Sequence, residues 1–272
     1  MYRLLFFLLI GQAAIAQVPL SVISYNIRYD NPDDGIHSWA NREIHVGDLL
    51  DYYHADIIGL QEALSNQYDG LKEILISYNS YGLGREDGDL DGEFCPIFWN
   101  RSRFDLEGKG TFWLNESGEV GEKGWDAATT RIASWVKLYD LDREKMFVII
   151  NTHFDHKGEE ARIESAKKIN ELIESRSWKE VILMGDLNCT AYSEPVEELK
   201  KILQRANDLC AYVPYGKTFT YSGFEVENPP GEEIDHVFVS DGFSVVKMRN
   251  IGDSRDGAYP SDHLPVHVHL TW

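Results

Sequence analysis

The chain contains few cysteines, and their arrangement excludes two common ways of stabilising a fold. There are three cysteines among 272 residues, an odd number at long spacings and without a Cys-x-x-Cys pair. A disulfide scaffold or a thiolate zinc site needs paired or closely spaced cysteines, so the pattern argues against both. We expect Cys95, Cys189 and Cys210 to be buried as small apolar side chains, and the sequence leaves open whether two of them pair.

Positive charge is also scarce. Lys and Arg total 26 against 45 Asp and Glu, which gives a net charge of −19 at pH 7. Such a chain repels polyphosphate at long range, so long duplex nucleic acid is not favoured as a partner. A local site with bound cations can reverse that field, and nucleic acid therefore stays open as a substrate.

Long apolar runs are absent except at the N-terminus. Residues 4–10 are uniformly apolar, follow Arg3 and precede Ala14-Ile15-Ala16. This order is typical of a signal peptide over residues 1–16, and the run is too short to span a membrane. A buried N-terminal strand or helix is the alternative. We expect an exported, periplasmic or secreted monomer that begins at Gln17 and has no membrane span.

Apolar, β-rich segments alternate with segments of helical periodicity throughout the rest of the chain. The clearest helix is predicted over 159–176, and others over 41–54, over 66–76 and from Ser193. Strands are predicted over 20–27, 56–62, 95–100, 131–141, 145–154, 180–186, 234–239 and 264–272, with a hairpin at Asp142-Arg143. No linker or repeat interrupts them, so residues 17–272 are predicted to form one mixed α/β domain.

Polar side chains recur where these apolar strands begin or end. In "VILMGDLNCT", Asp186 and Asn188 follow four apolar residues and point to the same side of the strand. Such residues occur at six strand ends: Asn26, Glu62, His153, Asp186 with Asn188, Asp235, and Asp262 with His263. Converging carboxylates repel one another unless a cation lies between them, and oxygen ligands suit Mg²⁺ or Mn²⁺.

The segments "SYNIRYDN", "GLQEA", "NTHFDHKGEEAR", "MGDLNCT", "IDHVFVS" and "YPSDHLPV" occur in this order. Together they resemble the endonuclease/exonuclease/phosphatase superfamily, and in particular an exported bacterial branch similar to the nocturnin and carbon-catabolite-repressor deadenylases. The resemblance implies a deoxyribonuclease I-like, four-layer α+β sandwich. In that fold two mixed, mostly antiparallel sheets pack face to face between helices, and the site lies where their strand ends meet.

The resemblance also implies roles for individual residues. Glu62 matches the principal metal ligand. Asn26 matches either a second metal ligand or a residue that contacts the ligands without binding the metal itself. Asp186 and Asn188 match the pair that positions the attacking water and the phosphate.

The remaining roles concern the phosphate. His153 matches a phosphate-contacting histidine, and Asp235 a carboxylate that steadies the phosphate side. Asp262 is expected to orient the catalytic His263. Arg131 is a candidate phosphate contact because a guanidinium binds phosphate through forked hydrogen bonds.

These roles predict a Mg²⁺- or Mn²⁺-dependent hydrolase that cleaves a phosphodiester by in-line attack of water. The alternatives are a phosphomonoesterase acting on sugar or inositol phosphates, a 3′–5′ exonuclease on short RNA, and, least favoured, a non-catalytic binding module. The number of metals, the general base and the substrate stay open. A small or short phosphoester is favoured over duplex DNA.

Other residues receive simpler interpretations. His267 and His269 alternate with apolar residues on the last strand, so both are expected to face solvent. The long loops 85–93 and 115–128 are expected to shape the substrate site. For Trp113, Trp125, Tyr259, Asp155 and His156, a substrate contact and a structural role are both open.

Overall fold

The computed structural model describes residues 19–272. The predicted signal peptide and its cleavage site before Gln17 lie outside the described residues. Within the described part of the chain, no helix is long and apolar enough to cross a membrane.

Two six-stranded sheets form the centre of the molecule. The first has the strand order β11 (Ser244–Asn250), β12 (Val266–Thr271), β1 (Leu20–Asn26), β2 (Ile57–Gln61), β4 (Ile97–Asn100) and β3 (Tyr78–Tyr81). The second has the order β5 (Phe104–Trp113), β6 (Ile132–Asp140), β7 (Lys145–His153), β8 (Val181–Asp186), β10 (Asp235–Val239) and β9 (Gln204–Arg205).

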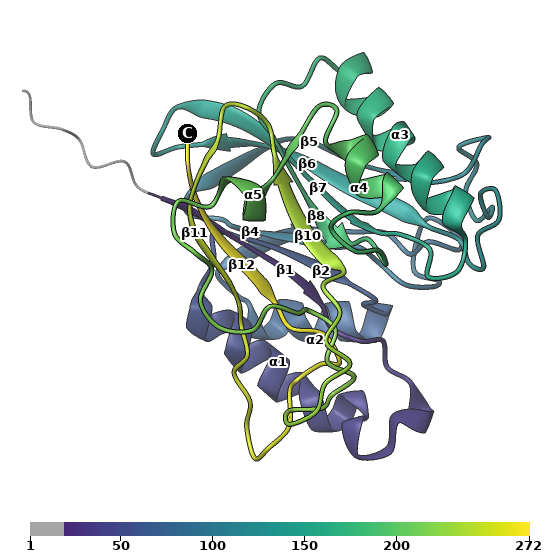
Figure 1. The fold of residues 1–272 in the computed structure, drawn as a ribbon, viewed down its shortest axis with the longest axis vertical. Helices are drawn as coiled ribbons and strands as arrows, with labels where there is room; N and C mark the ends of the chain where they lie inside the picture. Colours follow the sequence, from purple (N-terminus) through teal and green to yellow (C-terminus); the bar gives the residue numbers. More distant parts are fainter. Residues whose placement is uncertain (1–18) are drawn as a thin grey trace, which may run out of the picture.

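Helices cover the outer faces of both sheets and complete four layers (Figure 1). α1 (Trp39–Tyr53) and α2 (Ser65–Ile74) pack on the first sheet, and α3 (Glu159–Ser175) and α4 (Glu194–Leu199) pack on the second. The short helices η1 (Pro32–His37) and α5 (Ala206–Leu209) lie in connections. The predicted sandwich of two mixed sheets between helices is confirmed.

Each layer boundary contains its own apolar core, and strand alternation explains why. On β1, Val22 faces the second sheet and packs with Ile149 and Ile182, whereas Ile23 faces α1 and packs with Leu50. Successive strand side chains point to opposite faces, so a strand with helices on one side and a sheet on the other must be apolar on both. That is why these strands read as continuous apolar runs.

All predicted strands and helices exist, with bounds that differ by a few residues, and the Asp142-Arg143 hairpin joins β6 to β7. Three strands of four or more residues were not predicted: β3, β5 and β11. All three are sheet edges: β5 and β11 have several exposed positions, β5 contains Gly108 and Gly110, and β3 has only four residues. An edge strand buries less apolar surface, which weakens the pattern on which strand prediction depends.

The pairing directions bring the polar strand ends together. β1 and β2 are parallel neighbours, so the ends of both strands lie at the same edge of the first sheet. β7 and β8 are also parallel, and their pairing places His153 directly beside Asp186. β10 runs antiparallel to β8, which places Asp235 on the other side of Asp186. The topology therefore gathers residues from both sheets at one end of the sandwich.

Candidate active site

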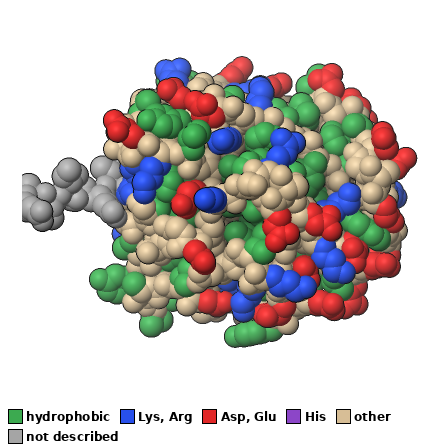
Figure 2. Space-filling view, turned by 90° about the horizontal axis from the view of Figure 1, so that it is seen from above, with side chains coloured by type: hydrophobic (Ala, Val, Ile, Leu, Met, Phe, Trp, Pro, Cys, Tyr) green, Lys and Arg blue, Asp and Glu red, His purple; other side chains and the backbone are tan. Residues whose placement is uncertain are grey.

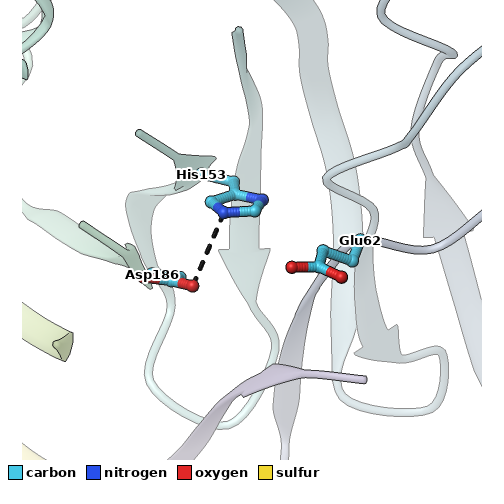
Figure 3. A group of neighbouring side chains, drawn as sticks. All are labelled: Glu62, His153 and Asp186. Carbon is cyan, nitrogen blue, oxygen red and sulfur yellow. Dashed lines mark ion pairs between the residues drawn. The ribbon is translucent and has the colours of Figure 1, made fainter. Parts of the chain in front are cut away.

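Two carboxylates from different sheets face each other across this end of the sandwich. Figure 3 shows Glu62, which follows β2, pointing toward Asp186 at the end of β8. Asn26 connects them, because its amide Nδ2 lies 3.0 Å from Glu62 Oε1 and 3.0 Å from Asp186 Oδ2. The backbone N–H of Arg28 donates to Asn26 Oδ1 at 3.0 Å, which fixes this amide orientation. In this geometry the amide nitrogen of Asn26 faces both carboxylates, and its oxygen accepts from the backbone of Arg28.

Asp186, Asn188 and His153 form a second connected group. The Asn188 backbone N–H donates to Asp186 Oδ1 at 2.8 Å, and its side-chain amide lies 3.0 Å from His153 Nε2. His153 Nε2 is also 3.5 Å from Asp186 Oδ2 (Figure 3). Asn188 has a φ of 49° and Glu62 a φ of 63°, and such left-handed conformations in non-glycine residues are concentrated at functional sites.

Gly185 is required for the close approach of β7 and β8 at this point. A Cβ atom on Gly185 would overlap the carbonyl oxygen of Thr152. Only glycine fits there without displacing the strand that holds His153 next to Asp186. The glycine of the sequence "MGDLN" is therefore part of the site's construction, not merely turn chemistry.

His263 is held by Asp235, which corrects the expectation that Asp262 orients it. The distance between His263 Nδ1 and Asp235 Oδ2 is 2.8 Å, and His263 Nε2 lies 3.7 Å from Asp186 Oδ2. Asp262 instead accepts a hydrogen bond from the Ser261 hydroxyl at 3.2 Å. Asp262 and His263 are consecutive, so in extended chain their side chains point to opposite sides, and proximity in sequence misidentified the partner.

Arg131 lies at the edge of the same site. Its Nε is 3.4 Å from Asp155 Oδ2, and its Nη2 is 3.1 Å from His156 Nδ1. Its Nη1 is buried and has no hydrogen-bond partner within residues 19–272. Asp155 is structural, because it also accepts backbone N–H groups of the loop, including those of Gly158 and Ala128.

The environment separates the protonation states of the two histidines. Burial would lower the pKa of His263, but Asp235 and Asp186 outweigh it and raise that pKa well above its usual value. Burial, followed by the charge of Arg131, lowers the pKa of His153 well below its usual value. Burial, followed by the charge of Asp235, raises the pKa of Asp186 to about 7. At neutral pH His263 is therefore an imidazolium and His153 is neutral.

The donor atoms fit a hard divalent cation. Glu62, His153 and Asp186 offer ligand atoms within 4.8 Å of one another, and so do Asp186, Asp235 and His263. Asp235 Oδ1 is buried and has no hydrogen-bond partner among the described residues. A bound cation or a hydrogen-bond donor of the substrate would satisfy this oxygen. Carboxylate oxygens are the ligands that Mg²⁺ and Mn²⁺ prefer. Glu62 and Asp186 would hold the ion.

A cavity of about 530 Å³ opens over these groups. Its wall includes Arg85 and Glu93 from the predicted substrate-shaping loop 85–93, together with Thr129 and His156. The volume is that of a small-molecule site. Trp113 does not line the cavity, and its indole N–H instead donates to the Arg85 carbonyl oxygen at 2.7 Å, which anchors the loop.

Sequence reasoning missed two supporting groups. Gln61 and Asn151 join the sheets behind the site through an Nε2–Oδ1 hydrogen bond of 2.6 Å. Glu93 Oε2 lies 3.7 Å from His153 Nδ1 and 2.7 Å from Arg85 Nη1. A polar residue inside each apolar strand was a signal for the first pair, whereas nothing local to Glu93 reveals that its loop folds back over β7.

The fold and the site together define a hydrolase of phosphate esters. A family model for the endonuclease/exonuclease/phosphatase family matches residues 23–263. The chain belongs to this family.

Solved structures agree with this assignment. An endonuclease/exonuclease/phosphatase family protein of Bacteroides thetaiotaomicron is 34% identical, with a TM-score of 0.90 over 93% of this chain and 98% of that one. A mannosyl-6-phosphatase of Bacteroides thetaiotaomicron is 35% identical, with a TM-score of 0.87 over 93% of this chain and 100% of that one. The human nocturnin catalytic domain, 20% identical with a TM-score of 0.73 over 93% of each chain, shares the fold.

One curated relative is an uncharacterized protein of Acanthamoeba polyphaga mimivirus, 23% identical over 263 residues. The match spans 81% of this chain and 38% of that protein, so the chain corresponds to well under half of the relative's length.

Proposed function

We propose that the protein hydrolyses phosphate monoesters of small polar molecules, with sugar phosphates as the leading substrate class, and that Mg²⁺ or Mn²⁺ is required. This is the alternative that the sequence placed second to phosphodiester hydrolysis. Metal-assisted attack of water on phosphorus is common to both reactions. The choice between monoester and diester substrates depends on what the cavity can bind in addition to one phosphate group.

The proposal rests on how many cationic side chains in the cavity are free to bind a phosphate group. Three arginines line it, and Arg28 holds Asp34 through two hydrogen bonds of 3.0 Å, while Arg85 is bonded to Glu86 and Glu93. Among the described arginines that line the cavity, only Arg131 has a buried nitrogen without a partner. One available guanidinium beside one cation site suits a single terminal phosphate better than a chain of phosphates.

The molecular surface and the relatives support the same choice. On the face shown in Figure 2, acidic and basic side chains are interspersed, so this face has no continuous cationic track for a nucleic-acid backbone. With a net charge of −19, the protein as a whole also repels polyphosphate. The 35% identical mannosyl-6-phosphatase links a closely similar fold to a sugar phosphate.

In this proposal each residue of the site has a role. A bound divalent cation would supply Lewis-acid stabilisation of charge on the phosphate oxygens. Arg131 Nη1 and the His263 imidazolium would donate to those oxygens, and Asn188 would hold the phosphate in line. Asp186 would accept a proton from the attacking water, since its carboxylate lies between Asn26 and His263 at the centre of the site.

A substrate panel tests the proposal. We would compare kcat/KM for mannose 6-phosphate, glucose 6-phosphate, bis(p-nitrophenyl) phosphate, short single-stranded RNA and plasmid DNA, all with Mg²⁺. We expect one of the sugar monophosphates to be fastest. A faster rate on the diester, the RNA or the plasmid would contradict the assignment to small monoesters while leaving the phosphoesterase class intact.

Arg131→Lys sharpens the test, because it keeps the charge and removes the forked donor. We expect kcat/KM for the sugar phosphate to fall about tenfold to a hundredfold, the loss that follows from one charge-assisted hydrogen bond of about 1.5–3 kcal/mol. An unchanged kcat/KM would remove Arg131 from phosphate binding.

We also propose that the protein is exported. The proposal rests on the order of Arg3, the apolar run 4–10 and Ala14-x-Ala16. Mass spectrometry of the protein from cells should find Gln17 as the N-terminus in an extracytoplasmic fraction, and an intact Met1 on the functional protein would contradict export.

A further inference from the structure

A second cavity, of about 480 Å³, lies on the outer face of the first sheet, away from the active site. We call it the β12 groove. It is lined by β11 and β12, by Tyr53 at the end of α1, and by the loop that contains Tyr212 and Tyr215. Figure 1 shows α1 and α2 lying under the first sheet, with β11 and β12 toward its edge.

Strand alternation puts histidines on this face. Val266, Val268 and Leu270 of β12 point into the core between the sheets, so His267 and His269 point outward into the groove. His267 is only 5% exposed, and the expectation that it faces solvent was wrong. Tyr53 covers it, with the two ring centroids 5.5 Å apart in an edge-to-face arrangement.

The groove contains buried polar nitrogens that the protein leaves unpaired. His267 Nε2 and Arg249 Nε have no hydrogen-bond partner among residues 19–272. Arg249 Nη2 is 3.5 Å from Asp253, and that contact leaves Nε free. An unsatisfied buried donor or acceptor costs about 1–3 kcal/mol, so two of them beside one cavity point to a ligand that satisfies them.

The groove differs from the rest of the molecule in charge. Lys247 and Arg249 line it, and no aspartate or glutamate does, although the chain has a net charge of −19; Arg249 pairs with Asp253 outside the groove, whereas Lys247 has no ion-pair partner among residues 19–272. The neighbouring cavity, which shares Tyr53, is lined by Asp48, Asp51 and Asp253. The β12 groove is therefore a local cationic site on an acidic protein, and an anionic ligand complements it.

Its other wall presents exposed apolar and aromatic side chains. Tyr215 is 87% exposed and Val213 is 92% exposed, and Tyr212 lies beside them. Flat aromatic rings with a polar tip favour ligands that have both apolar faces and hydroxyl groups, and neutral histidines serve such hydroxyls as donors or acceptors. Burial keeps His267 and His269 in that neutral state by lowering both pKa values.

We propose that the β12 groove binds an acidic oligosaccharide, with its anionic groups on Lys247 and Arg249, its hydroxyls on His267, and a sugar ring against Tyr215. The site lies at a different place from the phosphoesterase cavity and shares no residue with it. The proposal therefore does not depend on which phosphate ester the active site hydrolyses.

Isothermal titration calorimetry on the full mature protein tests the proposal. The probes are a galacturonic acid hexasaccharide and the neutral maltohexaose at low salt. We expect the acidic hexasaccharide to bind at least about tenfold more tightly, the effect of one charge-assisted hydrogen bond. Lys247→Ala should weaken its binding about tenfold, and Tyr215→Ala about threefold to tenfold, as for the loss of one aromatic contact.

Tyr192→Ala is the matched control, because Tyr192 is 91% exposed and lies outside the groove. It should leave binding unchanged, and all three variants should keep the wild-type phosphoesterase rate. The proposal is overturned if the acidic hexasaccharide does not bind, if both sugars bind equally, or if Lys247→Ala and Tyr215→Ala have no effect. Binding to phosphatidylglycerol vesicles without binding to the hexasaccharide would likewise overturn it, in favour of a membrane contact.

Discussion

His263 and His267 are four residues apart and equally buried, each 5% exposed, yet the protein holds them in opposite protonation states. His263 faces Asp235 and Asp186, and its pKa is raised well above the usual value. His267 faces no carboxylate in the groove, and burial, followed by the charges of His269 and Lys247, lowers its pKa to about 3. Burial alone neutralises an imidazole, whereas burial beside two carboxylates charges it.

Within this short segment, His263 belongs to the proposed catalytic site, whereas His267 belongs to the packing of the outer face of the sheet. His263 precedes β12, at the end of the sandwich where both sheets contribute carboxylates. His267 lies within β12, where only the outer face of one sheet is available. A buried histidine is therefore informative about catalysis only when its charged neighbours are known.

Alanine substitutions should give the largest contrast between the two histidines. We expect His263→Ala to lower kcat about 10²–10⁴-fold, the typical contribution of a positioned acid, base or phosphate donor. His267→Ala should leave kcat within about twofold of the wild type and instead reduce stability, because it removes packing against Tyr53. Steady-state rates and urea unfolding measure the two effects, and equal losses of rate would deny His263 its role.

The partner of His263 gives the next contrast. Asp235→Asn should lower kcat about tenfold to a hundredfold, because the imidazole loses both its orientation and the charge that raises its pKa. The alkaline limb of the pH–rate profile should move to lower pH in this variant. Asp262→Asn should move that limb less, because Asp262 hydrogen-bonds to Ser261 and raises the pKa of His263 only through its charge, after the larger effects of Asp235 and Asp186. If Asp262→Asn shifts the limb and Asp235→Asn does not, the expectation from sequence was right after all.

His267 should also make stability depend on pH. In the unfolded chain it binds a proton below about pH 6.5, but in the folded protein only near about pH 3. The unfolded state therefore binds more protons between these limits, and stability falls as pH falls. His267→Phe should remove about 1.4 kcal/mol per pH unit from this dependence between about pH 6 and pH 4. Urea titrations at several pH values would show it, and parallel curves for the two proteins would contradict the buried neutral state.

The sequence could predict much of the fold because its strongest signals were local. The apolar runs of β1, β2, β7 and β8 are buried on both faces, and each ends in a polar residue that reads as a departure from the run. These two features, with the order of the motifs, located the strand ends that form the site. The edge strands β5 and β11 bury less surface and escaped detection.

What the sequence could not predict was which side chains meet. Asp262 is next to His263 in the chain but points elsewhere, while Asp235 arrives from the second sheet, 28 residues away. His267 sits at a position that alternation marks as outward, yet Tyr53 from α1 covers it. Both outcomes depend on tertiary contacts between elements, and residue spacing within one strand carries no information about them.

In the proposed mechanism, the carboxylates of the two sheets hold a cation at the phosphoesterase centre. The most direct test measures hydrolysis of a sugar phosphate by the wild type and by Glu62→Ala, first with excess chelator and then with added Mg²⁺ or Mn²⁺. We predict that chelator abolishes the wild-type activity, that added metal restores it, and that Glu62→Ala remains folded but recovers little activity. Full activity of the wild type in excess chelator would contradict the account.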